Sequence, residues 1–209
     1  MMADLHEAVM RGDLGRVKRL LAGGLLRKKV DVMARHGNKS TALHLAAQTG
    51  HVGMVRLLLA SGAHPDAHDG DGCCPIHKAA EMGHAEVIKL LLDKGAEVDA
   101  PCGFNLTPLL YAADFGRTEA ARVLIERGGN ANVHGEEGRT PLHWAALRGN
   151  LELAQMLIAH GADMNAHDVT GHTPLTTAKG EGHLQVAAML RRQGATEEEE
   201  RGNLATARE

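Results

Sequence analysis

The hydrophobic positions of the chain recur with a period of 33 residues. Each period begins with a short segment that ends in two small residues, and continues with an aliphatic stretch such as 87–92. The short segment is long enough for about two helical turns. The aliphatic stretch places apolar residues at i, i+3 and i+4, the spacing of a helix with one buried face. The pattern therefore predicts a series of helix-turn-helix units, repeated in register.

The start of the first helix in each unit is marked by its residue types. A threonine can cap the helix with its hydroxyl group, and a proline fits the first helical position because its missing N–H has no role there. A small-residue pair follows, such as Ala79-Ala80, and then a glycine suited to a left-handed C-cap. Alanines allow a neighbouring helix to approach closely. The five starting positions are Thr41, Cys74, Thr107, Thr140 and Thr173.

The connections between units are rich in turn-forming residues, as in 162–171, and suit projecting hairpin-like loops. One unit cannot bury its own apolar face, so the units are expected to stack. We therefore expect one repeat domain over residues 1–201 and a C-terminal tail at 202–209. The expected boundaries are a capping unit at 1–36 and repeats at 37–69, 70–102, 103–135, 136–168 and 169–201.

These motifs resemble the ankyrin-repeat family. The resemblance rests on Thr140-Pro-Leu-His-Trp-Ala-Ala146 and on 157–165, and it covers nearly the whole chain. It implies an all-α solenoid of about six helix-turn-helix units with projecting hairpin loops. It also implies a protein-binding role, through a concave surface formed by the loop tips and the exposed side of each first helix. Some animal ankyrin repeats are hydroxylated at loop asparagines, a position that Asn132 and Asn165 occupy.

Three departures from the pattern predict local differences. The link after the capping unit is about five residues longer than the others, around 25–29, which predicts a surface insertion or a small basic contact element. Lys39 stands where other units have glycine, so the first hairpin is expected to be irregular. Polar residues at 179–181 replace the second small residue and its neighbours, as expected for the outer face of a capping repeat.

Composition agrees with such a stack. Aromatic residues make up only 2% of the chain, so its core must be built from small and aliphatic side chains. The formal net charge is -3, which gives no general attraction to nucleic acid or anionic membrane. Residues 1–36 nevertheless hold eight Lys or Arg against four acidic residues. The alternative of a transcription-linked or nucleic-acid-associated factor rests on Arg16, Lys18, Arg19, Arg27, Lys28 and Lys29.

The sequence predicts no catalytic, cofactor or metal site. It lacks nucleotide-binding, serine-hydrolase and zinc-protease motifs. Cys73 and Cys74 are adjacent, not spaced as zinc ligands, and with Cys102 they form no disulfide framework. Asp69-Gly-Asp-Gly72 is interpreted as a turn, because the later ligands of a calcium loop are missing. We expect a cytoplasmic, or nuclear, monomer with no membrane segment and no small-molecule substrate.

Most of the fourteen histidines fall at repeat positions or on loops. In the ankyrin family the histidine of the Thr-Pro-Leu-His motif braces neighbouring loops, a role implied for His44, His77 and His143. Histidines 51, 84 and 183 follow the glycine of the first helix, which is another family position.

All four aromatic residues lie between 104 and 144, and three of them fall at positions that the repeat leaves exposed. Large aromatic residues and arginines are enriched in binding hot spots. The alternative is intramolecular packing, with Trp144 covering a neighbouring helix and Tyr111 stacking on it. The predicted partner-binding residues are Met82, Phe104, Leu106, Tyr111, Asp114, Phe115, Arg139, Trp144, Leu147 and Arg148. We predict a protein-interaction module acting as adaptor, inhibitor or targeting subunit.

Overall fold

The structure, a computed structural model, describes residues 2–23 and 30–196. The chain divides into two compact units, residues 1–130 and residues 131–209. The predicted tail at 202–209 and the basic residues at 27–29 lie outside the described residues.

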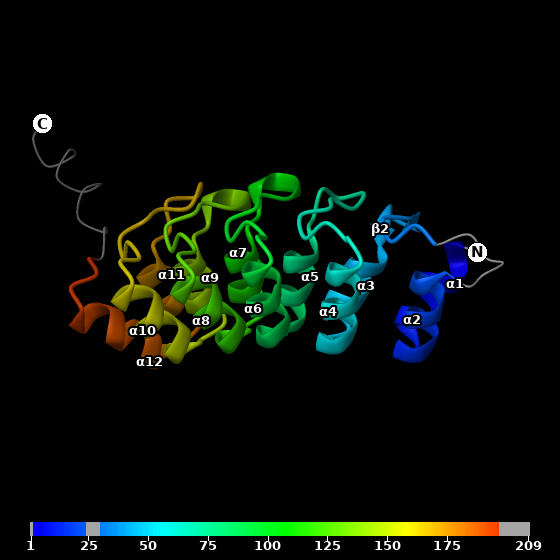
Figure 1. Cartoon of the computed structure of the whole chain (residues 1–209). Helices are drawn as coiled ribbons and strands as arrows, with labels where there is room; N and C mark the ends of the chain where they lie inside the picture. The colour runs from blue at the N-terminus through cyan, green and yellow to red at the C-terminus, as the bar shows by residue number, and fades with distance from the viewer. Residues whose placement is uncertain (1, 24–29, 197–209) are drawn as a thin grey trace, which may run out of the picture. The chain divides into compact units, whose positions relative to one another are not determined.

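The first unit is a stack of helix pairs (Figure 1). The first helices of the pairs pack on one another in chain order, and the second helices do the same. This is the stacking that the repeat pattern predicts. The elements are α1 (Met2–Met10), α2 (Leu14–Ala22), β1 (Arg35–His36), β2 (Ser40–Thr41), α3 (Ala42–Gln48), α4 (Val52–Ala60), α5 (Pro75–Met82), α6 (Ala85–Asp93), the 3-10 turn η1 (Gly103–Asn105), α7 (Pro108–Asp114) and α8 (Thr118–Glu126).

The second unit has the same construction. Its first helices α9 and α11 pack together, and so do its second helices α10 and α12. Its elements are the 3-10 turn η2 (Glu136–Gly138), α9 (Pro141–Leu147), α10 (Leu151–Ala159), α11 (Pro174–Gly180) and α12 (Leu184–Arg192).

Each first helix begins where the sequence predicts. Thr107 has extended backbone and accepts a hydrogen bond from the Leu110 N–H at 3.5 Å, with Pro108 as the first helical residue. The turn after the helix requires a positive φ, which glycine supplies: Gly83 has φ 80°. The short helices therefore have defined ends, set by local chemistry at both termini.

The core contains small and aliphatic side chains. The paired alanines are fully buried, as Ala79 and Ala80 show, and each first helix also buries a branched residue such as Ile76. Because alanine projects only a methyl group, successive first helices can approach closely enough to exclude water. A larger side chain at these sites would overpack the interface, at a cost of about 1–3 kcal/mol.

The first hairpin is more regular than the sequence suggested. Residues 35–36 pair antiparallel with 40–41, in the register Arg35↔Thr41 and His36↔Ser40. The irregularity is confined to Lys39, which adopts φ 54° in a region that glycine favours. Pairing of the strands therefore tolerates the lysine, at the cost of local backbone strain.

Histidines connect successive repeats through their rings. In His44, Nδ1 accepts a hydrogen bond from the Thr41 N–H, so the proton is on Nε2, which donates to the Cys73 carbonyl at 3.0 Å. His77 bonds Leu106 in the same way, and His143 bonds His172. The bracing role implied by the family resemblance is confirmed for these three residues.

His6 takes the same role in the capping unit, where its Nε2 lies 3.1 Å from the Ser40 carbonyl oxygen. This link joins residues 34 apart, whereas the His44 link joins residues 29 apart. The difference of five residues confirms the length of the predicted insertion. It also shows that the insertion leaves the contact between the repeats unchanged.

Candidate protein-binding face

Two of the large apolar side chains that the first unit exposes lie at the ends of its first helices α5 and α7. Met82, at the end of α5, is 42% exposed, and Phe115, directly after α7, is 45% exposed. The two residues lie 33 positions apart and thus occupy equivalent places in successive repeats. Neither place is needed for the core, which the buried faces of the helices already fill. Contiguous exposed apolar patches mark interaction surfaces, and these two positions are candidates for part of one.

Tyr111 lies next to Phe115 on α7. The two rings stack with a centroid separation of 6.4 Å and an angle of 6°. Tyr111 also contacts the His77 ring, with a centroid separation of 5.6 Å and an angle of 78° between the rings. The tyrosine hydroxyl contacts the thiols of Cys73 at 3.5 Å and Cys102 at 3.4 Å. Tyr111 is therefore held in one orientation, half-buried, and supports the more exposed Phe115.

The remaining predicted residues of the first unit differ in their roles. Leu106 is half-buried, and its backbone carbonyl is the acceptor for His77. Asp114 is half-buried at the end of α7. Phe104 lies in η1, and its side chain is outside the described part of the structure. The structure thus brings Tyr111 and Phe115 together, with Leu106 serving the repeat contact through its backbone.

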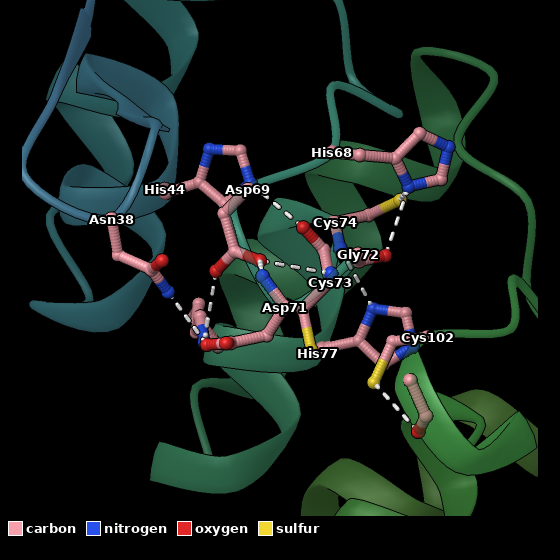
Figure 2. A network of polar contacts seen from close by, with 12 residues as sticks. Asn38, His44, His68, Asp69, Asp71, Gly72, Cys73, Cys74, His77 and Cys102 are labelled. Atoms are coloured by element: carbon pink, nitrogen blue, oxygen red, sulfur yellow. Dashed lines mark hydrogen bonds and ion pairs between the residues drawn. The ribbon is translucent and has the colours of Figure 1, made fainter.

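Asp69 is a buried carboxylate of the first unit, within a network of polar contacts (Figure 2). Oδ1 of Asp69 accepts hydrogen bonds from the backbone N–H groups of Asp71 and Cys73, both at 2.9 Å, which confirms the predicted turn. Oδ2 accepts no directional hydrogen bond and faces the Lys78 ammonium at 3.1 Å. Burial by itself would raise the pKa of Asp69, but the backbone hydrogen bonds and Lys78 lower it below its ordinary value. The carboxylate therefore stays charged, and it fixes Lys78 on the α5 surface.

In the second unit, the predicted residues form a separate arrangement. The Arg139 guanidinium carbon lies 5.3 Å from the centre of the Trp144 ring. Its Nη2 also contacts Glu137 Oε2 at 3.1 Å. Arg139 and Trp144 are both half-buried, and their contact covers part of the surface of each. Leu147 is half-buried and Arg148 is exposed at the end of α9.

Sequence reasoning missed how closely Tyr111, Cys73 and Cys102 approach one another. The register showed that Cys102 occupies the repeat position of Asp69, but the spacing could not show where its side chain points. Among the described residues, His, Cys, Asp and Glu side chains form no group of three that could hold a metal ion. Within the same residues, no helix is both long and apolar enough to span a membrane.

The chain belongs to the ankyrin-repeat family. The family model for ankyrin repeats (3 copies) matches residues 5–102 and 100–168. Among individual proteins, it is 42% identical over 69 residues to ankyrin repeat protein FPV240 of Fowlpox virus (strain NVSL), a match to 33% of this chain and 16% of the viral protein.

Protein phosphatase 1 regulatory subunit 27 is also similar. The mouse protein (Mus musculus) is 41% identical over 74 residues, and the human protein (Homo sapiens) is 38% identical over 74 residues. Each of these matches covers 35% of this chain and 45% of the relative. The chain thus matches less than half the length of these relatives.

Proposed function

We propose that the chain is a non-catalytic adaptor or targeting subunit that binds a partner protein through the exposed ends of its first helices. The observation that carries this proposal is the pair of exposed residues, Met82 and Phe115, at equivalent places at the ends of α5 and α7. Tyr111 stacks against Phe115 and limits its motion, so little side-chain entropy is lost when a partner covers the ring.

The second unit carries its own set of proposed binding residues, separate from those of the first unit. Trp144 and Leu147 lie on α9, and Arg148 directly follows it. Arg139 lies over the Trp144 ring. Arg139 is paired with the carboxylates of Glu137 and Asp168, and these contacts hold its guanidinium against the Trp144 ring. We propose Trp144, Leu147 and the two arginines as the binding residues of the second unit, and we add Leu106 and Asp114 to those of the first unit.

The relatives offer one defined partner to test. Two of them are named as regulatory subunits of protein phosphatase 1. A targeting role also agrees with the sequence of this chain, in which we found no catalytic motif. We therefore propose the catalytic subunit of protein phosphatase 1 as the first candidate. The three free thiols agree with a reducing compartment, either cytosol or nucleus, and we propose that the chain acts there as a monomer.

The experiment compares the affinity of purified protein phosphatase 1 catalytic subunit for the wild type and for a Met82→Ala/Phe115→Ala variant, by isothermal titration calorimetry. Truncating two hot-spot side chains should weaken binding at least tenfold, or by about 1.4 kcal/mol. Leu184→Ala is the matched control, because Leu184 is 75% exposed on α12 but lies on a second helix.

Circular dichroism of each variant shows that it is still folded. Equal affinity of wild type and double variant would refute the proposed face. If the phosphatase does not bind, the same pair of variants is compared in affinity purification from cell extract. The proposed face then requires a protein that the wild type and Leu184→Ala retain and the double variant loses.

A further inference from the structure

Two cysteine thiols converge on one tyrosine hydroxyl in the first unit. Cys73 precedes the cap of α5, and Cys102 precedes η1 on the next hairpin loop. Their sulfur atoms lie 3.5 and 3.4 Å from the same oxygen, Oη of Tyr111. The two sulfurs therefore cannot be farther apart than the sum of these two distances. Figure 2 shows both cysteines in the network around the loops.

The third cysteine does not join this pair. Cys74 follows Cys73 directly, but its sulfur lies 3.5 Å from Nδ1 of His68. It caps α5, where the other repeats have threonine. Cys73 and Cys74 are adjacent in the chain, but their side chains contact different residues. Cys73 lies near Cys102 in space, because both sulfurs contact the Tyr111 hydroxyl.

We propose that Cys73 and Cys102 form a reversible intramolecular disulfide, a redox-sensitive modification site within the first unit. The oxidant is a small disulfide of the glutathione type. A thiolate of the chain attacks it, releases one equivalent of reduced thiol and forms a mixed disulfide. The second cysteine then loses its proton, attacks the protein sulfur and releases a second equivalent of reduced thiol. Two thiols of the chain are oxidised as one small disulfide is reduced.

Accessibility sets the order of the two steps. Cys73 is 1% exposed and Cys102 is 9% exposed, so the small disulfide reaches Cys102 first and Cys73 completes the bond. Burial and the neighbouring Cys102 thiol raise the pKa of Cys73 to about 12. Because only the thiolate attacks, oxidation is slow, and the pair responds to sustained rather than brief oxidation.

The bond changes the environment of Tyr111. A disulfide requires a sulfur–sulfur distance of about 2.05 Å, so the two sulfurs must move together and the hydroxyl loses both thiol partners. Tyr111 stacks on Phe115, and oxidation therefore disturbs the exposed ring as well. This consequence for binding rests on the proposed function, whereas formation of the disulfide does not.

The test treats the full chain with oxidised glutathione and maps the products by mass spectrometry. We expect a loss of about two mass units and a cross-linked peptide pair joining Cys73 to Cys102. Cys74→Thr is the matched control, because it restores the threonine of the other repeats and should leave the cross-link unchanged. The variants Cys73→Ser and Cys102→Ser should each abolish it.

A Cys73–Cys74 bond, or stable mixed disulfides without a cross-link, would overturn the proposal. Tyr111 is the only tyrosine of the chain, so the NMR signal of its ring gives a second measurement that does not depend on a partner. The signal should change on oxidation of the wild type and return on reduction. An unchanged signal in cross-linked protein would refute the predicted effect on the binding face and leave the proposed function untouched.

Discussion

Acid should weaken the contact between α5 and the next hairpin through His77. Its ring is fully buried, with Nδ1 accepting a hydrogen bond from the Cys74 N–H and Nε2 donating to the Leu106 carbonyl. A second ring proton would remove the acceptor and place a charge in an apolar site. Burial lowers the pKa of His77 from 6.5 to about 4, with smaller opposing contributions from the hydrogen bonds to the backbone.

The sign of the effect follows from these two values. The unfolded chain takes up the proton at a higher pH than the folded chain, so stability is fully present above pH 6.5 and is lost as the pH falls towards 4. Between pH 7 and pH 5 the loss from this one residue is about 2 kcal/mol, by linkage of the two pKa values. The pKa values of His44 and His143 are lowered chiefly by burial, so these residues act in the same direction.

A His77→Leu variant isolates the contribution of His77. Leucine is accommodated at the equivalent position of α7, where Leu110 is 1% exposed. The variant loses two buried hydrogen bonds and should be about 2–3 kcal/mol less stable than the wild type at pH 7. Its further loss on going to pH 5 should be about 2 kcal/mol smaller than that of the wild type.

Urea unfolding followed by circular dichroism at both pH values gives the four free energies of unfolding that this comparison needs. His44 and His143 remain in both proteins, so their contributions cancel in the difference. If wild type and variant lost equal stability between pH 7 and pH 5, the assignment of the pH dependence to His77 would be refuted.

Two further substitutions test the contacts that hold the repeats. Lys78→Met leaves the buried Asp69 carboxylate without its cation, and the free energy of unfolding in urea should fall by about 2 kcal/mol; an unchanged value would show that the ion pair contributes nothing to folding. Gly149→Ala should lower the free energy of unfolding more than Gly182→Ala does, by at least about 1 kcal/mol. A Cβ atom at position 149 would lie 2.5 Å from Nδ1 of His183, whereas no atom lies within 4 Å of a Cβ at position 182. Both glycines have positive φ, so equal losses would indicate backbone strain alone.

Much of the local structure could be predicted because it depends on neighbours in the chain. Thr107 and Pro108 mark a helix start, and Gly83 marks a helix end, through short-range hydrogen bonds and φ preferences. The exposure of Met82 and Phe115 also followed from the sequence, since the 33-residue register separates buried from outward positions. Burial and exposure are easier to predict in a repeat protein, because the same pattern of buried and outward positions recurs in every unit.

The side-chain contacts between repeats could not be predicted in the same way. His6 bonds Ser40 although the Thr-Pro motif is missing from its unit, because the helix places the ring in the same position as in the other repeats. Lys39 was expected to disturb its hairpin, yet the strands pair, because one strained residue costs less than the loss of that pairing.

By itself, the sequence determined the family, the order of the helices and the residues that each helix buries. These properties follow from periodicity and from the chemistry of helix ends, which act over a few residues. Only the tertiary structure decided that Cys73 and Cys102 meet at Tyr111 while Cys74 turns towards His68. Such contacts depend on side-chain directions in loops held by neighbouring repeats, and neither composition nor spacing specifies those directions.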